Sequence, residues 1–568
     1  LGASDWSSTG AGIVLDATAA VGGTLEDVTI RNGTIRGVAN SVAVYLGSAD
    51  FVRLENVTLA GTDSDDGESY GIFVGGTIEG LILDGVDVSG FKYDNVRFDG
   101  QSSNVTILDS VFTGSQSGSG IYFREPTYGL RIENSRTSNN DDHGIHANVG
   151  SDMTMLGHVA EANGSSGARL LGRTDAASLV VRNSRASSND DGFYLEYWGS
   201  VEFRDSIAED NSDSGFEFYY IDTLNMLDNV AEGNGYGFYG YYDYDEDYTN
   251  GDGAWTFLRN RIVGNSRGFY AGYIGRMTVR DSSAMDNSQY GFDIEEVYGP
   301  MALTGNVASG TDGIGDGFLV TDLPGPLTMR NNRAEDNLGD GFFLNDVDSG
   351  LIERNVASSN GSEGFTLDDV DDTRVFRNQA TSNSGEGFSL DDIDDSVYAR
   401  NRSFDNGGDG FYITYTYDTR FERNSAIDNG EDGFESDDDN DNSENLVFRN
   451  NEARLNSGDG FNLEDVDVLL AVRNNRAVAN GDDGFDFDYL EDLSVTRNLA
   501  RLNGDDGFYF DTDIDDFVAV AGNRALANFA WGMYHDDGYL IGRRNTAKDN
   551  GIGGCYDVDC GRRQTVRP

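Results

Sequence analysis

The chain has 568 residues and a formal net charge of -59, because 99 aspartates and glutamates face only 40 lysines and arginines. So acidic a surface argues against nucleic acid as a partner, since phosphate binding depends on cationic side chains. No apolar run approaches the roughly 20 residues that a membrane helix needs, so we expect no membrane span.

The first 120 residues contain short runs in which apolar and polar residues alternate before an Asn or Asp. Such runs lie at residues 28–35, 52–59 and 105–109. Alternation with a period of two predicts short strands with one inward face. We therefore expect residues 1–120 to form irregular β-coils.

Over residues 121–550, a unit of about 23 residues is copied along the chain. Its clearest mark is a Gly-Phe pair such as Gly364-Phe365, which follows the pattern Asn-x-Ala-x-x-Asn, as in Asn355, Ala357 and Asn360. Regularity at this length indicates a solenoid, whose units bury their apolar faces only by stacking.

Each unit has room for two or three short strands and contains no stretch long enough for a helix. After Gly-Phe, the segment 365–367 alternates with Phe and Leu inward, and Gly and Asx residues then turn the chain. The unit therefore predicts an all-β, single-stranded parallel β-helix solenoid with about 23 residues per coil. An Asn at an inward bend can hydrogen-bond to the Asn one coil above, so we expect structural Asn columns.

These segments and the Asn-x-Ala-x-x-Asn and Gly-Phe units resemble the right-handed parallel β-helix repeat superfamily, the pectate-lyase-like fold. The resemblance covers nearly the whole chain and implies that the solenoid is right-handed. That superfamily includes lyases, glycosidases, epimerases, adhesins and structural rods, so the resemblance does not by itself imply an activity.

The sequence matches the catalytic motifs of enzymes in this superfamily only in part. Polygalacturonase-like members share Gly-Asp-Asp-Gly, present at 481–484 and 504–507, but the same slot recurs on many coils and is therefore expected to be a turn. Lyase-like and epimerase-like members use a basic residue, and the Asp-Pro-His-Glu segment of alginate epimerases is absent. For His143 and His146 we expect exposed turn positions rather than a zinc site.

Acidic runs after the Gly-Phe pair predict columns of carboxylates on stacked coils, about 5 Å apart. These acidic columns would repel unless cations lie nearby, and calcium suits ligand sets made of oxygen alone. Adaptation to concentrated salt, where screening weakens the repulsion, is an equally good explanation. The candidate calcium ligands are Asp368, Asp369, Asp371, Asp391, Asp392, Asp394, Asp465 and Asp467.

Tyrosines are concentrated between Tyr194 and Tyr298, close to the Gly-Phe pairs of consecutive coils. A ladder of tyrosines suits stacking on sugar rings or packing against a protein, and the alternative is cross-strand packing alone. The candidate ligand-binding residues are Tyr197, Trp198, Tyr219, Tyr220, Tyr241, Tyr242, Tyr244, Tyr273 and Tyr298.

Residues 551–568 form the expected C-terminal cap, and they hold the only two cysteines, Cys555 and Cys560. A disulfide between them would pin the last coil and indicate an oxidising compartment, whereas two free thiols are the alternative. Leu1 opens no recognisable signal peptide, so a secretion signal would already have been removed.

Our leading hypothesis from sequence is a secreted or cell-surface structural or adhesive rod. It would self-associate end to end or side by side into filaments and bind cations, with no organic cofactor. The alternative is a carbohydrate-active enzyme (polysaccharide lyase, glycosidase or epimerase) or a glycan-binding module, with a polysaccharide bound near the tyrosines. Its acids and bases would come from Asp243, Asp245, Glu246, Glu295 and Glu296.

Overall fold

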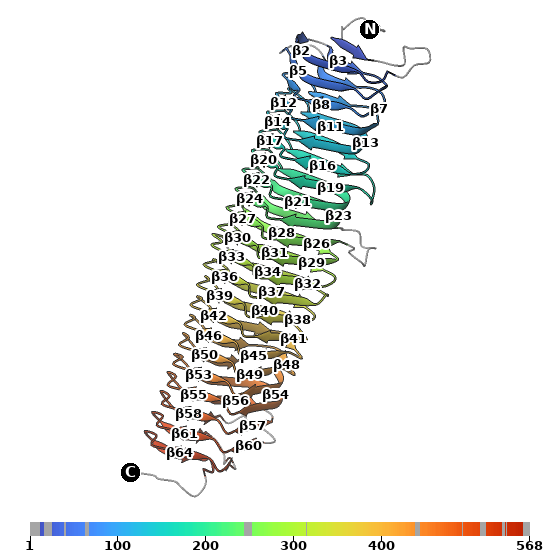
Figure 1. The fold of residues 1–568 in the computed structure, drawn as a ribbon. Helices are drawn as coiled ribbons and strands as arrows, with labels where there is room; N and C mark the ends of the chain where they lie inside the picture. Colours follow the sequence, from blue (N-terminus) through green and yellow to red (C-terminus); the bar gives the residue numbers. More distant parts are fainter. Residues whose placement is uncertain are drawn as a thin grey trace. The chain divides into compact units, whose positions relative to one another are not determined.

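Each sequence repeat folds as one coil of short strands, and successive coils stack with their strands parallel (Figure 1). A representative coil consists of β40 (Phe365–Val370), β41 (Thr373–Phe376) and β42 (Gln379–Thr381). On the next coil β43 (Phe388–Asp391) pairs in parallel with β40, and Phe365 lies opposite Phe388. Equivalent asparagines of these coils are 23 residues apart. The predicted all-β parallel solenoid is therefore confirmed.

The computed structural model describes residues 12–15, 25–38, 41–62, 68–242, 253–313, 315–437, 443–490, 492–511, 518–536, 540 and 542–560. All the elements in these ranges are strands. The chain divides into two compact units: the first comprises Leu1–Thr278 and Ser282–Asn287, and the second comprises Val279–Asp281 and Ser288–Pro568.

Strands that follow the Gly-Phe position form one face of each unit, here called the Gly-Phe sheet. In the first unit they are β3 (Val42–Leu46), β6 (Tyr70–Val74), β10 (Val96–Phe98), β13 (Ile121–Glu133), β15 (Ile145–Val149), β18 (Ala168–Gly172), β21 (Phe193–Arg204), β23 (Ser214–Leu227), β25 (Tyr236–Tyr241) and β28 (Arg267–Ile274). In the second unit they include β31 (Phe292–Val297), β34 (Phe318–Leu323), β37 (Phe342–Val347), β40, β43, β47 (Phe411–Ile413), β51 (Phe434–Ser436), β54 (Phe461–Arg473) and β56 (Asp486–Leu490).

Two further rows of strands complete the coils. One row includes β16 (Met153–Leu156), β19 (Ser178–Arg182), β35 (Leu327–Arg330), β38 (Gly350–Glu353) and β41. The other includes β14 (Arg136–Ser138), β17 (Val159–Glu161), β20 (Arg185–Ser187), β22 (Ile207–Glu209), β36 (Arg333–Glu335), β39 (Val356–Ser358) and β42. Together the three rows enclose the core.

The core of the second unit contains an uninterrupted stack of phenylalanines. Phe365 and Phe388 have ring centroids 4.8 Å apart and an interplanar angle of 4°, and the rings above and below repeat this geometry. Each buried Phe contributes roughly 2 to 3 kcal/mol through removal of its surface from water. The glycine before each Phe is required by close packing, because a Cβ on Gly364 would lie 2.7 Å from the carbonyl oxygen of Gly387.

Asparagine columns satisfy the backbone at the inward bends, as predicted. The backbone N–H of Asn355 donates to Oδ1 of Asn378 at 2.8 Å, and Nδ2 of Asn355 donates to the same oxygen at 3.1 Å. Nδ2 also donates to the carbonyl of Met329 at 3.0 Å. A second column repeats the arrangement at Asn360 and Asn383. The asparagines therefore have a structural role.

An acidic residue before the Gly-Phe glycine is structural on several coils, as expected for a repeated turn. The backbone N–H of Glu363 donates to Oδ1 of Asp340 at 3.0 Å, and that of Asp432 donates to Oδ1 of Asp409 at 2.6 Å. Burial and neighbouring Glu435 raise the pKa of Asp409 to about 10. These carboxyls therefore accept a backbone hydrogen bond from the next coil.

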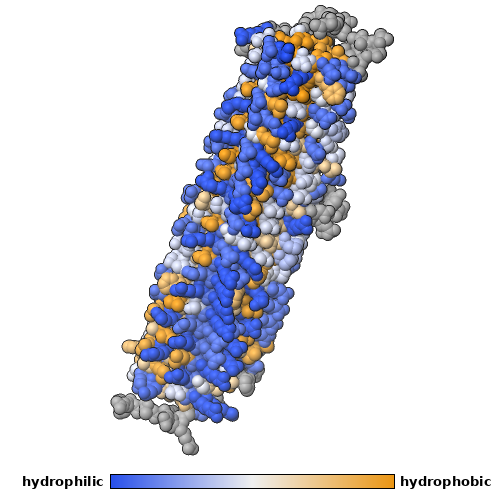
Figure 2. Space-filling view, in the orientation of Figure 1, coloured by the Kyte–Doolittle hydropathy of each residue, from blue (hydrophilic) through white to orange (hydrophobic). Residues whose placement is uncertain are grey.

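The surface is predominantly hydrophilic on the face drawn in Figure 2, with a continuous hydrophilic band along the second unit. Cys555 and Cys560 form a disulfide in the last described coil. Among the described residues there is no helix of the length and apolarity that crossing a membrane requires.

Candidate functional site

One outward-facing column on the Gly-Phe sheet of the first unit brings together the residue types of acid–base chemistry. On β15, β18, β21 and β23, His146 lies opposite Arg169, Arg169 opposite Tyr194, and Tyr194 opposite Glu217. Successive side chains of a strand point to opposite faces, and the neighbours Phe193 and Leu195 are fully buried in the core. The four side chains therefore project outward; they are called the outer column below.

His146 is partly buried by aromatic neighbours. Its ring packs edge-to-face on Tyr122 at 4.9 Å and on His143 at 5.0 Å. Burial, His143 and the positive charge of Arg169 lower the pKa of His146 to about 4, so this imidazole is neutral at neutral pH. A neutral imidazole can accept a proton.

The expectation of exposed turn positions is wrong for both histidines, because His143 is buried and His146 is a partly buried residue of strand β15. Nδ1 of His143 accepts a hydrogen bond from the backbone N–H of Ser166 at 3.2 Å. His143 thus occupies the turn slot that Asp340 fills elsewhere, and its ring closes one side of the His146 environment. Burial lowers its pKa to about 4.

Arg169 lies between His146 and Tyr194. Its guanidinium carbon is 5.1 Å from the centre of the Tyr194 ring, a cation–π contact. Nε of Arg169 is buried and has no hydrogen-bond partner, and the described residues give Arg169 no ion pair. An arginine without a carboxylate partner is notable in a chain of net charge -59, and it is suited to an anionic ligand.

Glu217 is only 8% exposed although it lies on the outer face of the sheet. Tyr219 donates its hydroxyl hydrogen bond to Oε1 of Glu217, and Tyr194 and Tyr239 flank it on the adjacent strands. Burial and the nearby charge of Asp191 raise the pKa of Glu217 to about 8, so the carboxyl is protonated at neutral pH. It can therefore donate a hydrogen bond.

Tyr194 is a second proton donor in the column. Its hydroxyl donates to Oε2 of Glu196 at 3.2 Å, and burial together with Glu196 raises its pKa. The column thus places a neutral acceptor and a protonated donor on the two strands that flank Arg169.

A stacked pair of tyrosines lies farther along the same strands. Tyr197 and Tyr220 have ring centroids 4.9 Å apart at an interplanar angle of 10°, and Tyr197 is 48% exposed. Both adopt the left-handed backbone conformation, with φ of 62° and 53°, as does Tyr273 at 58°. This conformation is uncommon for a bulky residue and is best tolerated by Gly, Asn and Asp.

Many equivalent positions of the second unit carry aspartates in the same conformation, including Asp369, Asp392 and Asp465, and others carry Tyr415 and Tyr489. Each of these aspartates is followed by a buried apolar residue, just as Trp198 and Ile221 follow Tyr197 and Tyr220. Aspartate therefore has a backbone reason to recur there, independent of any cation. Tyrosine has no such reason, but Tyr489 of the second unit holds the same position, so a binding role for Tyr197 and Tyr220 depends on the pocket beside them.

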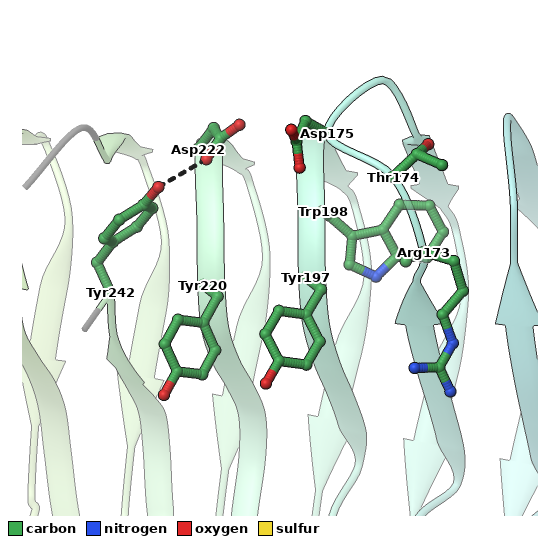
Figure 3. A pocket seen from close by; sticks show the side chains of 9 residues that line it. Arg173, Thr174, Asp175, Tyr197, Trp198, Tyr220, Asp222 and Tyr242 are labelled. Atoms are coloured by element: carbon green, nitrogen blue, oxygen red, sulfur yellow. Dashed lines mark hydrogen bonds between the residues drawn. The ribbon is translucent and has the colours of Figure 1, made fainter. Parts of the chain in front are cut away.

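A pocket of about 340 Å³ opens beside this pair (Figure 3). Its walls include Arg173, Asp175, Tyr197, Asp222 and Tyr242. The hydroxyl of Tyr242 donates to Oδ1 of Asp222 at 2.8 Å, and Nε of Arg173 donates to Oδ1 of Asn148 at 2.8 Å. Aromatic faces combined with charged and hydroxyl groups fit the surface of a sugar.

The other predicted ligand-binding residues have different positions. Trp198 lines the pocket but is 1% exposed, and its Nε1 donates to the carbonyl of Leu170 at 3.0 Å. Tyr219 and Tyr241 pack edge-to-face at 4.8 Å next to Glu217. Tyr298 belongs to the second unit, where its hydroxyl donates to Glu296.

The acidic residues that the sequence analysis named as possible catalytic acids and bases also lie in different parts of the chain. Glu295 and Glu296 belong to the second unit, and Glu296 is engaged by Tyr298. Tyr244, Asp243, Asp245 and Glu246 lie outside the described residues.

The candidate calcium ligands lie on adjacent coils. Asp368 pairs in register with Asp391, and the backbone N–H of Asp394 donates to Oδ1 of Asp371 at 2.8 Å. Burial and neighbouring aspartates raise the pKa values of Asp371 and Asp392. Within the described ranges the acidic groups close enough to share an ion are other residues, such as Asp409, Asp432 and Glu435. Calcium binding stays a prediction.

Sequence reasoning did not identify His146, Arg169 and Glu217 as candidate functional residues. In the coils that contain His146 and Arg169, Gly144-Ile145 and Gly167-Ala168 replace the Gly-Phe pair, so the repeat is harder to recognise there. The residue two positions after each of these glycines would have identified the column.

Comparison with known proteins supports the architecture. The model of the family described as "Right handed beta helix region" matches five overlapping parts of the chain, residues 11–176, 94–246, 248–404, 325–466 and 441–566. No curated protein matches the sequence.

Similar solved structures include pectate lyase Pel9A, with 15% identity, a TM-score of 0.31, and coverage of 48% of this chain and 82% of that chain. The A-module of the Azotobacter vinelandii mannuronan C-5 epimerase AlgE4 has 15% identity and a TM-score of 0.32, and the match covers 64% of this chain and 87% of that chain. A double mutant of the periplasmic alginate epimerase AlgG has 13% identity and a TM-score of 0.31, and the match covers 68% of this chain and 78% of that chain.

Proposed function

Because the chain belongs to the right-handed β-helix family, we propose that its first unit is a carbohydrate-active enzyme that acts on uronate-containing polysaccharides. The observation that carries the proposal is the outer column, in which His146 and Tyr194 flank an arginine without an ion pair. Adjacent strands are about 4.8 Å apart, so the three side chains can reach one sugar ring.

The chemistry follows from the protonation states of these groups. The guanidinium of Arg169 would bind the sugar carboxylate and stabilise the negative charge that develops when the neighbouring carbon loses its proton. Neutral His146 accepts that proton, and the carbon–hydrogen electron pair forms a carbon–carbon double bond. The glycosidic carbon–oxygen bond breaks at the same time, and the leaving oxygen receives the proton of Tyr194. This sequence is a β-elimination.

Substrate binding would also tune the base. Arg169 is one of the groups that lower the pKa of His146, and a carboxylate on Arg169 offsets its positive charge. The basicity of His146 therefore rises when substrate is present. Glu217, protonated and next to Tyr194, offers a further hydrogen-bond donor to the sugar.

The same proposal puts the chain outside the cell or at the cell surface, where polysaccharide is found and where the Cys555–Cys560 disulfide would persist. Assembly into filaments stays a prediction.

The test is product formation on uronate polysaccharides, with neutral polysaccharides as a comparison. Wild-type protein should release products with the ultraviolet absorbance of an unsaturated uronate, and Arg169→Gln and His146→Gln should lower kcat/KM at least about 100-fold. Arg131→Gln, which alters an exposed arginine paired with Glu133, is the matched control and should behave as wild type.

The pH dependence supplies a second readout. Because His146 must be neutral in the free enzyme, the acid limb of kcat/KM should lie near pH 4, below the ordinary histidine value of 6.5. An acid limb at or above the ordinary value, or turnover that survives Arg169→Gln, would contradict the assignment.

A further inference from the structure

The tyrosine stack ends at a glycine, and that is where the pocket opens. The position occupied by Tyr197 on β21 and Tyr220 on β23 is occupied on the preceding coil by Gly172, the last residue of β18. Gly172 has no side chain, so that coil supplies no ring at this position to stack on the adjacent face of Tyr197. Figure 3 shows the two parallel rings and the open space between Tyr197 and Arg173.

Close packing explains why this position is a glycine. A Cβ on Gly172 would lie 2.1 Å from the carbonyl oxygen of Tyr197 and 3.2 Å from the Trp198 ring. Trp198 itself is held in place by its hydrogen bond to the carbonyl of Leu170, and it forms the inner wall. The gap is therefore a built feature of the coil and has a rigid aromatic base.

The groups around the gap are complementary to a pyranose ring. The exposed face of Tyr197 offers a stacking surface on one side, and Arg173 lies on the other. Arg173 is positioned by two hydrogen bonds to Oδ1 of Asn148. The carboxylates of Asp175 and Asp222 line the same pocket and can accept hydrogen bonds from sugar hydroxyls.

We infer that one pyranose ring of the polysaccharide binds in the gap above Gly172, stacked on Tyr197 and held by Arg173 and Asp175. Linking this ring to the reacting chain rests on the proposed function. Gly172 follows Arg169 by three residues on one strand, a separation of about 10 Å. That distance exceeds one pyranose ring, so the bound ring is a distal unit of the substrate, and the oligosaccharide between the two sites runs along the strand direction.

Tyr197→Asn is the decisive variant, because Asn tolerates the left-handed conformation that Tyr197 adopts and the fold is not expected to suffer. Tyr489→Asn is the matched control: Tyr489 has φ of 47° in the second unit and is 54% exposed. The probes are uronic-acid oligosaccharides of increasing length, with binding measured by titration calorimetry and turnover measured in parallel.

We expect Tyr197→Asn and Arg173→Gln to weaken binding of the longer oligosaccharides at least tenfold. The effect should appear mainly in KM, whereas kcat should stay close to wild type. Tyr489→Asn should bind as wild type. The advantage that a longer oligosaccharide has over a short one should disappear in Tyr197→Asn, because the short one does not reach the pocket.

The outcomes separate this inference from the proposed function. Binding by wild type that Tyr197→Asn abolishes, without any turnover, would support the pocket and overturn the enzyme. Turnover and length dependence that Tyr197→Asn leaves unchanged would overturn the pocket and support the enzyme. Absence of binding of any oligosaccharide to the wild type would overturn the pocket as well.

Discussion

Glu217→Gln should stabilise the protein at neutral pH while impairing its activity. In the folded chain burial and Asp191 raise the pKa of Glu217 from 4.5 to about 8, so folding requires the uptake of a proton at neutral pH. At pH 7 this uptake costs about 3 kcal/mol, because each pH unit above the unfolded-state pKa contributes about 1.4 kcal/mol. Glutamine has nearly the same shape and needs no proton.

The pH dependence fixes the sign of the effect. A group with a raised folded-state pKa stabilises fully below its unfolded-state pKa and loses that contribution as the pH rises through its folded-state pKa. The free energy of unfolding of Glu217→Gln should therefore match wild type near pH 4 and exceed it increasingly up to about pH 8. Above that pH the advantage should stay constant at roughly 5 kcal/mol, less about 1 to 3 kcal/mol for any hydrogen bond that Gln makes less well.

Chemical denaturation followed by tryptophan fluorescence measures this difference, because Trp198 and Trp255 are both buried in the same unit. Glu202→Gln is the control: Glu202 is exposed and paired with Arg182, so its removal should change stability by less than about 1 kcal/mol at any pH. If Glu217→Gln were no more stable than wild type at pH 8, the reasoning that Glu217 is buried and protonated would be refuted.

Three further predictions concern the second unit. Asn378→Ala removes two hydrogen bonds accepted by Oδ1 and two donated by Nδ2. Urea denaturation should therefore show a free energy of unfolding that is lower by roughly 3 to 4 kcal/mol. In the control Gln379→Ala, which alters the half-exposed neighbour, this free energy should fall by less than about 1 kcal/mol. Burial and neighbouring acids raise the pKa values of Asp409 and Asp459 to about 10 and about 9, so at constant ionic strength the Tm should fall as the pH rises from 6 to 10; a rising Tm would count against buried, protonated carboxyls. If the acidic columns hold calcium, EDTA at low salt should lower the Tm, and an unchanged Tm would show that they do not.

The fold could be predicted because its determinants are local and repeated. The glycine of Gly364-Phe365 is needed by a backbone contact, and the Asn355 and Asn378 side chains satisfy the bends, so each coil carries the same signal. Stacking then multiplies that signal along the chain.

The site was harder to predict because it depends on register between coils that differ in sequence. His146, Arg169 and Tyr194 are neighbours only because β15, β18 and β21 pair in register, and their coils carry Ile145, Ala168 and Phe193 after the glycine. The burial of His143 was also hidden, since the same turn slot elsewhere carries carboxyls. Tyrosines were visible as a composition, but the pocket beside Tyr197 was not, because it depends on Gly172 of the preceding coil.

Proton transfer at the carbon next to a sugar carboxylate is the reaction that the outer column is inferred to catalyse, and it can be followed directly. Uronate oligosaccharides incubated with the protein in deuterium oxide and analysed by nuclear magnetic resonance should lose the signal of that hydrogen and gain a carbon–carbon double bond. Arg169→Gln should leave the oligosaccharides intact. If the wild type left this hydrogen in place on every uronate tested, or if Arg169→Gln removed it at the wild-type rate, the account of the outer column would be contradicted.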